Sequence, residues 1–304
     1  MDRRRFIATA LSGLATATMG CRGRAQETLP ALPAELPMRP LGGTGIRATI
    51  VAAGTGMSAT MRQSNQIRQG KDAFIALLRH EYDRGIRLFD CADAYGSHPY
   101  VAEALAGMPR EEYAISTKIW VMQGGLPEPE RPDANVVVDR FRKELNTDYI
   151  DLVLIHCMAH PLWPEQQRRY MDALAELKGK GTIRAHGVSI HSLPALEACV
   201  DCDWVDSVHA RINPYGDSMD ERDPANVAAI LQRIHQRGKG VVGMKLIGEG
   251  RYRNDPAKRD AAIAYALDVG CVDTMVVGFE RPDEVDDFIG RVSRALADRP
   301  ATAG

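Results

Sequence analysis

Four polar residues of kinds that together can transfer a proton lie at the ends of short apolar runs in this sequence. Asp90 and Tyr95 occur in FDCADAYG, Lys118 ends YAISTK, and His156 ends IDLVLIH. Reducing a carbonyl by hydride requires a proton for the developing alkoxide, and a tyrosine can donate it although its free pKa is about 10. A nearby ammonium group stabilises the phenolate and lowers that pKa. The residues therefore predict general acid catalysis.

Each of the four residues has a role in this hypothesis. Tyr95 is the acid, Lys118 supplies the ammonium group, Asp90 pairs with Lys118 and fixes it, and His156 orients the substrate oxygen. Taken singly, each also has an ordinary structural explanation, such as a turn-capping aspartate or a histidine satisfied in the core. Four such residues at successive predicted strand ends favour the catalytic interpretation.

The elements that must position these residues alternate along the chain. Runs typical of β-strands cover residues 46–54, 86–93, 113–118, 150–156, 183–190, 204–210, 240–245 and 272–278, and amphipathic stretches cover 73–84, 99–106, 132–146, 165–179, 192–199, 222–237, 256–268 and 282–292. This alternation predicts parallel βαβ units, and the nearly all-apolar strands predict a sheet covered on both faces. Eight units fit a (β/α)₈ TIM barrel of the α/β class, whose catalytic groups lie at the C-terminal strand ends. A doubly wound open sheet is the weaker alternative, because no G-x-G-x-x-G opens a helix after an early strand.

The N-terminal segment differs from the rest of the chain. Arg3 to Arg5 precede a short apolar run that ends at Gly20-Cys21, which predicts a twin-arginine export signal over residues 1–25. We expect export to the periplasm through the export machinery, with a lipid anchor at Cys21 as an open alternative. A cytoplasmic location is the lesser alternative. Residues 26–37 are a Pro-rich linker, residues 38–296 the single barrel domain with an N-terminal β-hairpin, and residues 297–304 a tail.

Composition excludes several other classes of function. Of 304 residues, 45% are hydrophobic and 26% charged, which is ordinary for a globular protein. The formal net charge of −2 provides no basic field for nucleic acid. Cys199 and Cys202 have the spacing of a redox motif, but lack its helix-start setting and a second ligand pair for a metal. Whether these two cysteines form a disulfide stays open, and no metal site is expected.

The quoted motifs resemble the aldo-keto reductase superfamily. FDCADAYG, STK, LIH, GVS and the opening MRPLGGTGIRATIVAAGTG carry the resemblance, which covers about residues 38–290. It implies a (β/α)₈ barrel that binds NADP(H) without a Rossmann domain, and a catalytic tetrad of Asp90, Tyr95, Lys118 and His156. It also implies a small-molecule carbonyl substrate.

The nicotinamide site implied by this resemblance departs from the family pattern. The implied cofactor-binding residues are Gly54, Thr55, Ser189, His209, Met244, Lys245 and Arg281. The family usually has Ser-Asn after the fifth strand, whereas this chain has Ser189-Ile190, with His191 as a candidate substitute. His209 stands where the family has Gln, and Met244 where it often has a stacking Tyr. Met can pack on a ring face, although less rigidly.

The stretch expected to read the adenosine 2′-phosphate is acidic. VVGFERPDEVDDF contains only one basic residue, Arg281, among several carboxylates. A phosphate site needs positive charge, ideally from Arg. The cofactor is therefore NADP or NAD, with NADP favoured by the resemblance alone. Trp120 and Trp163 are candidate substrate-pocket residues, and the short C-terminal tail predicts an open pocket mouth.

Two other functions remain as alternatives. The first is a non-catalytic barrel that retains the tetrad and binds a ligand or partner, which the altered nicotinamide site favours. The second is a barrel lyase or isomerase that uses Lys118 or Lys245 as a Schiff base. That alternative leaves Tyr95 and His156 without a role, and the sequence does not identify the substrate.

Overall fold

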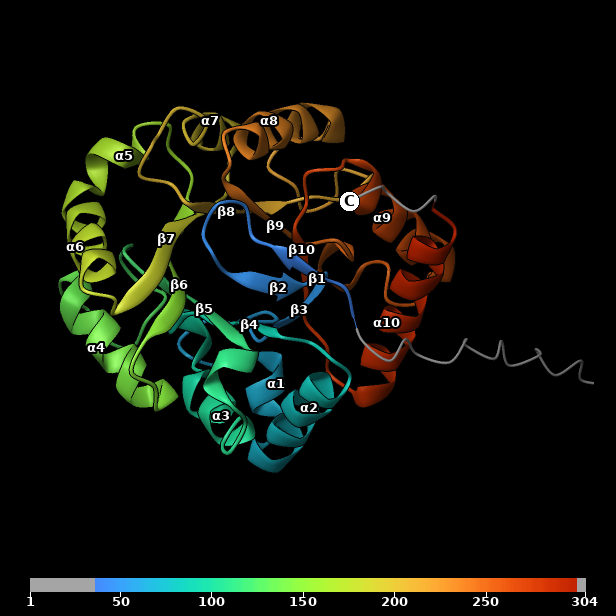
Figure 1. Cartoon of the computed structure of the whole chain (residues 1–304), viewed down its shortest axis with the longest axis horizontal. Helices are drawn as coiled ribbons and strands as arrows, with labels where there is room; N and C mark the ends of the chain where they lie inside the picture. Colours follow the sequence, from blue (N-terminus) through green and yellow to red (C-terminus); the bar gives the residue numbers. More distant parts are fainter. Residues whose placement is uncertain (1–35, 300–304) are drawn as a thin grey trace, which may run out of the picture.

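The alternating segments of the sequence become parallel strands and the helices that cover them. A computed structural model of the chain describes residues 36–299. The barrel strands are β3 (Val51–Gly54), β4 (Leu88–Asp90), β5 (Ala114–Ile119), β6 (Ile150–Met158), β7 (Ile183–Ile190), β8 (Ser207–Arg211), β9 (Gly240–Met244) and β10 (Thr274–Val277). They pair in parallel in the closed order β10-β3-β4-β5-β6-β7-β8-β9, which Figure 1 shows as a ring with helices outside it. The predicted (β/α)₈ barrel is confirmed.

Helices follow the strands on the outside of the ring. They are α1 (Asn65–Arg68), α2 (Lys71–Asp83), α3 (His98–Ala104), α4 (Ala134–Leu145), α5 (Trp163–Gln166), α6 (Arg168–Gly179), α7 (Leu193–Glu197), α8 (Pro224–Gln236), α9 (Pro256–Asp268) and α10 (Pro282–Ala297), with 3₁₀ turns η1 (Asp93–Tyr95), η2 (Arg110–Glu112) and η3 (Gly248–Gly250). Every predicted amphipathic stretch contains a helix. The sequence pattern did not predict α1, because a helix of a single turn, capped by the Ser64 side chain, has no apolar periodicity.

The predicted N-terminal hairpin closes one end of the barrel. β1 (Met38–Pro40) pairs with β2 (Arg47–Thr49) in antiparallel fashion, and Figure 1 shows the hairpin lying over the ring of strands. Leu41 and Ile46 enter the cluster of apolar side chains inside the barrel. The Gly43 N–H donates to the carbonyl of Gly238, just before β9, at 2.6 Å. The hairpin thus covers the N-terminal strand ends and leaves the C-terminal ends for a site.

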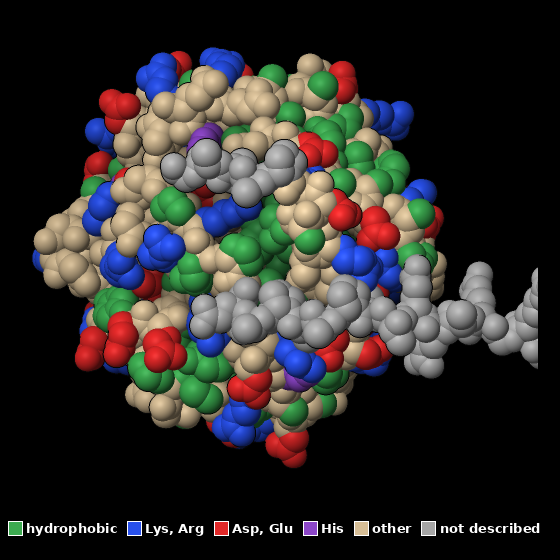
Figure 2. All heavy atoms as spheres, turned by 45° about the vertical axis from the view of Figure 1, so that its right-hand side comes forward, with side chains coloured by type: hydrophobic (Ala, Val, Ile, Leu, Met, Phe, Trp, Pro, Cys, Tyr) green, Lys and Arg blue, Asp and Glu red, His purple; other side chains and the backbone are tan. Residues whose placement is uncertain are grey.

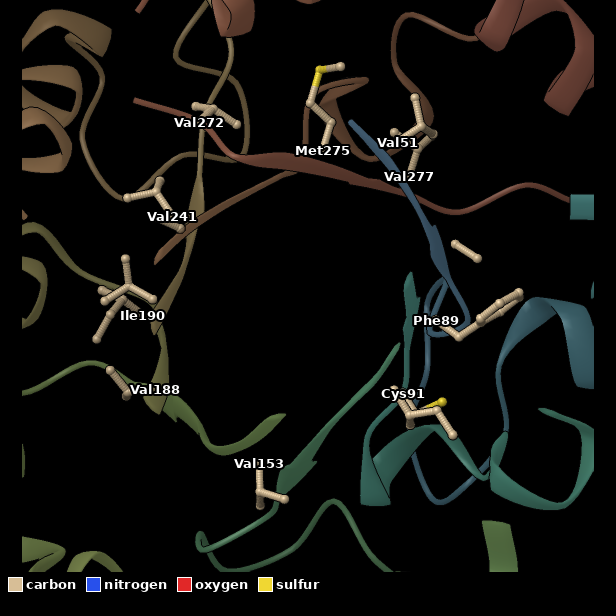
Figure 3. Packing of buried hydrophobic residues seen from close by; sticks show 14 of the residues in the cluster. Val51, Phe89, Cys91, Val153, Val188, Ile190, Val241, Val272, Met275 and Val277 are labelled. Atoms are coloured by element: carbon tan, nitrogen blue, oxygen red, sulfur yellow. The ribbon is translucent and has the colours of Figure 1, made fainter. Parts of the chain in front are cut away.

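Side chains alternate between the barrel interior and the helix layer. Figure 3 shows Val51, Phe89, Val153, Val188 and Met275 around the outside of the strands, where they belong to the large cluster packed against the helices. Since successive residues of a strand point to opposite faces, the neighbours of these residues point inward.

The surface carries charges of both signs. Figure 2 shows Lys and Arg side chains interspersed with Asp and Glu over the face drawn, in keeping with the net charge of −2. Within residues 36–299, none of the helices combines the length and apolar character that crossing a bilayer requires. The predicted export signal, Cys21 and most of the linker lie outside the described residues.

Candidate active site

Strand alternation brings polar side chains from neighbouring strands to the same end of the barrel. Phe89 on β4, Ile119 on β5 and Ile155 on β6 belong to the outer cluster. Asp90, Lys118 and His156 are their immediate neighbours in sequence, so these three face inward near the C-terminal strand ends. Three short segments separated in sequence therefore deliver one cluster.

Asp90 and Lys118 form a buried ion pair. Lys118 Nζ lies 2.6 Å from each carboxylate oxygen of Asp90 and donates to the Cys91 carbonyl at 2.9 Å. Burial alone would raise the pKa of Asp90, but the Lys118 charge and a hydrogen bond from His209 hold it well below its usual value. The carboxylate is thus ionised and fixes the ammonium group.

Tyr95 stands beside this pair at the end of η1. Lys118 Nζ lies 4.9 Å from the centre of the Tyr95 ring, and the His156 ring lies edge-on at 5.6 Å. No group among residues 36–299 hydrogen-bonds the phenolic oxygen, and Tyr95 lines a cavity. Burial, followed by the Asp90 charge, raises the pKa of Tyr95 well above its ordinary value. The lowered pKa expected from the sequence is wrong for this state, because burial of the phenol and the charge of Asp90 both raise the pKa of Tyr95.

His156 completes the cluster as a neutral imidazole. Burial, followed by the Lys118 charge, lowers the pKa of His156 well below its ordinary value. Its Nδ1 is buried with no hydrogen-bond partner among the described residues. The Trp120 ring packs edge-on against the His156 ring at 5.2 Å between centres. A neutral imidazole held this way can hydrogen-bond a substrate oxygen without adding charge.

One cavity of about 550 Å³ contains most of the predicted site. It is lined by all four predicted catalytic residues and by further predicted residues, namely Gly54, Trp120, Ser189, Met244 and Lys245. Its dimensions suit a small-molecule site, and its lining mixes apolar surface with a few convergent polar groups. The structure therefore brings these nine residues together from six of the eight barrel strands or the loops that follow them.

Four predicted residues, Trp163, Thr55, Arg281 and His209, lie outside this cavity, which corrects the sequence interpretation. Trp163 is fully buried, donates through Nε1 to the Ala195 carbonyl and packs on Trp204, so it belongs to the core. Thr55 is buried and bonds the Asp90 carbonyl at 2.9 Å, which makes it a strand-end support. Arg281 lies at the start of α10 with its guanidinium on Asp283.

His209 was also expected to contact the cofactor, and the structure places it elsewhere. It is fully buried on β8, and its Nε2 donates to Asp90 Oδ1 at 3.0 Å. The donor must be His209, because Asp90 is ionised. His209 therefore stabilises the Asp90–Lys118 ion pair by a hydrogen bond and does not line the cavity.

His191 and Cys157 meet in the cavity wall. Sequence reasoning left His191 as a possible amide partner and missed Cys157, which follows His156 with a left-handed φ of 62° at an irregularity in β6. Cys157 Sγ lies 3.3 Å from His191 Nε2, and Arg211 donates to His191 Nδ1. Burial, followed by the charges of Arg211 and Lys245, lowers the pKa of His191 to about 3. Both ring nitrogens are thus already engaged within the protein.

The acidic stretch after β10 is tied up by its own ion pairs. Glu280 accepts hydrogen bonds from Asn65 and Arg253. Arg281, whose side chain is 57% exposed, pairs with Asp283 at 3.0 Å and with Glu284 at 3.1 Å. The carboxylates of this region and its arginines, Arg253 and Arg281, are therefore engaged with one another.

Comparisons with known proteins agree with this barrel and site. The model of the aldo/keto reductase family matches residues 53–261. The chain is 31% identical over 157 residues to methylglyoxal reductase DkgB of Salmonella typhi, a match that covers 47% of this chain and 54% of that protein. It is 35% identical over 127 residues to an aldo-keto reductase of Mycobacterium leprae, covering 40% of this chain and 41% of that one. These matches thus span about half the length of the curated relatives, or less.

Solved structures show the same fold over nearly the whole described chain. A Pseudomonas aeruginosa structure assigned to the aldo-keto reductases superposes with a TM-score of 0.70 at 24% identity, covering 87% of this chain and 99% of that one. An aldo-keto reductase of Bacillus halodurans in its holo form gives 0.68 at 20% identity, covering 88% and 93%. Fold and strand-end cluster define a (β/α)₈ barrel with a polar site at the C-terminal ends of its strands. The chain belongs to the aldo/keto reductase family.

The cavity fits the nicotinamide half of the family's dinucleotide cofactor better than its 2′-phosphate. Next to Tyr95, Met244 supplies an apolar surface and Ser189 a hydroxyl, and Lys245, paired with Glu249 at 2.7 Å, is a cation suited to a diphosphate. The carboxylates at the start of α10 do not fit a 2′-phosphate. Among residues 36–299 no cluster of His, Cys, Asp and Glu is arranged to hold a metal ion.

Proposed function

We propose that this protein is a nicotinamide-dependent oxidoreductase that reduces an aldehyde or ketone, or oxidises the corresponding alcohol. The observation that carries the proposal is Tyr95, whose unbonded phenol faces the cavity beside the Asp90–Lys118 pair and His156. The family membership and the name of the Salmonella relative, a methylglyoxal reductase, support a carbonyl substrate.

The chain's own residues account for proton transfer. The Tyr95 phenol donates a hydrogen bond and then its proton to the carbonyl oxygen as negative charge develops there. Lys118, held by Asp90, faces the resulting phenolate, and neutral His156 holds the oxygen in line. The bound nicotinamide cofactor supplies the hydride for reduction and accepts it in oxidation.

A turnover assay tests this proposal. The purified chain is mixed with NADPH or NADH and a panel of small aldehydes and ketones, including methylglyoxal, and loss of reduced nicotinamide is followed. We expect turnover with at least one carbonyl class. Binding of nicotinamide without turnover on any of them would contradict the proposal.

We further propose that the enzyme discriminates weakly between the two cofactors. Family membership favours NADP, whereas Arg253 and Arg281, the cations nearest the end of β10, are already paired with Glu280 and Glu284 and would have to leave them to bind a 2′-phosphate. A carboxylate can instead accept hydrogen bonds from a ribose with free hydroxyls, as in NAD sites of other folds. We expect NADP to be favoured by no more than about tenfold, or ~1.4 kcal/mol.

A binding barrel without turnover is the second candidate. The observation that favours it is the altered amide slot, where Ile190 replaces Asn and His209 is committed to Asp90. In that case the chain would bind a ligand in the same cavity, and substituting Tyr95 would change no reaction rate.

We also propose export through the twin-arginine route, on the strength of Arg3 and Arg4 before a short apolar run. Periplasmic localisation follows, with membrane attachment if Cys21 carries a lipid. Replacing both arginines by lysine should leave the folded precursor in the cytoplasm. Normal export of that variant in a fractionation experiment would refute the route without touching the enzyme proposal, and mass spectrometry of the exported chain would show whether Cys21 is acylated.

A further inference from the structure

The turn that contains Tyr95 is stabilised by a buried carboxylate that lies outside the cavity. Asp93 begins η1, two residues before Tyr95, and its side chain is 3% exposed. Its Oδ1 accepts from Arg62 at 3.0 Å and its Oδ2 accepts from Arg140 on α4 at 2.7 Å. Asp93 is not part of the cavity lining. Its bonds therefore act on the turn and not on a ligand.

The segment that contributes Arg62 lies directly against this turn. The Arg62 N–H donates to the Ala94 carbonyl at 3.0 Å. Gly96 has a φ of 73°, and a Cβ there would lie 2.2 Å from the Arg62 carbonyl oxygen, so a side chain at Gly96 would push the two segments apart. Arg62 thus hydrogen-bonds the two residues that precede Tyr95, Ala94 through its backbone and Asp93 through its side chain.

The loop between β3 and α1 wraps around Tyr95 in a strained conformation. Ser58, Met61 and Arg62 all have left-handed φ values, of 47°, 51° and 57°. Such a conformation is unfavourable for a non-glycine residue and persists only where surrounding contacts enforce it. At the start of the loop, Gly56 faces the Tyr95 ring, where a Cβ would lie 2.4 Å from a ring carbon. The ion pair of Arg62 with Asp93 is one contact that enforces this geometry.

Arg62 also contacts the loop between β5 and α4. Its Nη1 donates at 2.7 Å to Glu128, in the loop between β5 and α4 that begins with Trp120. The Tyr95 oxygen itself has no partner among the described residues, so nothing at the tip of the side chain fixes its position. We propose that Arg62 and Asp93 are positioning residues, which hold the Tyr95 phenol where a reacting oxygen would lie. This rests on the proposed role of Tyr95 as acid.

The test combines kinetics with a direct view of Tyr95. The full chain is labelled with 3-fluorotyrosine, and the ¹⁹F resonance that Tyr95→Phe removes is assigned to Tyr95. We expect Arg62→Met to shift or broaden that resonance and to lower kcat about tenfold or more, because small misplacements of reacting groups are costly, while KM for the cofactor stays unchanged. Arg62→Lys should bring both the ¹⁹F resonance and kcat part of the way back to those of the unaltered protein, because lysine keeps the charge but loses the forked geometry of the guanidinium.

The matched control is a surface pair far from this turn in sequence. Arg237 and Asp201 are 2.6 Å apart with side chains 56% and 74% exposed, so Arg237→Met should leave the resonance and kcat unchanged. If Arg62→Met only lowers Tm, with the Tyr95 resonance and kcat as in the unaltered protein, the role is merely structural and the inference is wrong. The resonance needs no turnover, so if the unaltered protein shows no activity the resonance alone decides whether Arg62 positions Tyr95.

Discussion

The two halves of the cavity follow different rules. In the catalytic half, made by Asp90, Tyr95, Lys118 and His156, every group has the partner or the freedom that carbonyl reduction requires. In the cofactor half, at the ends of β7 to β10, Ser189, Met244 and Lys245 line the cavity, whereas His209 and the carboxylates after β10 lie outside its lining. The comparison teaches that, under the proposed function, the residues of proton transfer follow the pattern that the family resemblance implies, whereas those that would hold the cofactor depart from it.

The catalytic half should fail most severely when its acid is removed. Tyr95→Phe deletes only the phenolic proton, so carbonyl reduction should fall by ~10²–10⁴-fold while cofactor binding persists. Lys118→Met should lower the rate comparably, because the phenolate formed during reaction would lose its counter-charge. Steady-state kinetics with a nicotinamide-binding control measures both. Unchanged turnover in Tyr95→Phe would break the comparison, since the catalytic half would then have no assigned acid.

Substituting His209 tests whether this residue acts with the catalytic half, through Asp90, or with the cofactor half. His209→Leu leaves Asp90 with one partner fewer, and a hydrogen bond to a charged group is worth about 1.5–3 kcal/mol. We expect kcat/KM to fall by roughly tenfold and unfolding in urea to occur at lower concentration. His209→Gln keeps a donor and should lose less. A rise in the KM for the cofactor at constant kcat would instead show that His209 contributes to cofactor binding.

The pH dependence of reduction should be flat through the neutral range. Reduction needs the protonated phenol, and the pKa of Tyr95 is raised above its ordinary value of 10.0, so activity is lost only as pH rises beyond that point. The lowered pKa of His156 keeps it neutral, so it adds no loss of activity between pH 6 and about 8 by protonation. A kcat profile in reduction measures this. A fall centred near pH 7 would contradict the assignment of the acid.

Arg281 should have the smallest effect. Its guanidinium is held by Asp283 and Glu284 and lies outside the cavity. Arg281→Ala should therefore change the ratio of NADP to NAD affinity by less than about threefold, or ~0.7 kcal/mol. A shift of tenfold or more toward NAD would show that Arg281 leaves its carboxylates to bind the phosphate.

The sequence predicted the barrel because each strand and most helices carry their own local signal. Residues 152–155, for example, are an unbroken apolar run directly followed by His156, and the strand-end rule placed that histidine at the end of the barrel where it lines the cavity. The clustering of the four predicted residues was predictable for the same reason, since Asp90, Lys118 and His156 lie near the ends of their strands and Tyr95 lies in the turn after β4.

What the sequence did not reveal depends on contacts distant along the chain. His209 reaches Asp90 across 119 positions, and Arg62 reaches Asp93 from a loop with no periodic pattern. Trp163 has the same local setting as Trp120, but the contacts of α5 with α7 and Trp204 decide that it is buried. Local sequence patterns carry no information about which distant residues come into contact.

The most direct test of the account is a nicotinamide fluorescence titration of the purified chain with NADPH and NADH side by side. The account predicts that both bind and that their Kd values differ by no more than about tenfold, because the catalytic half is intact and the 2′-phosphate meets carboxylates. Tyr95→Phe should give the same two curves. A preference for NADPH of several hundredfold, or no binding of either cofactor, would contradict it.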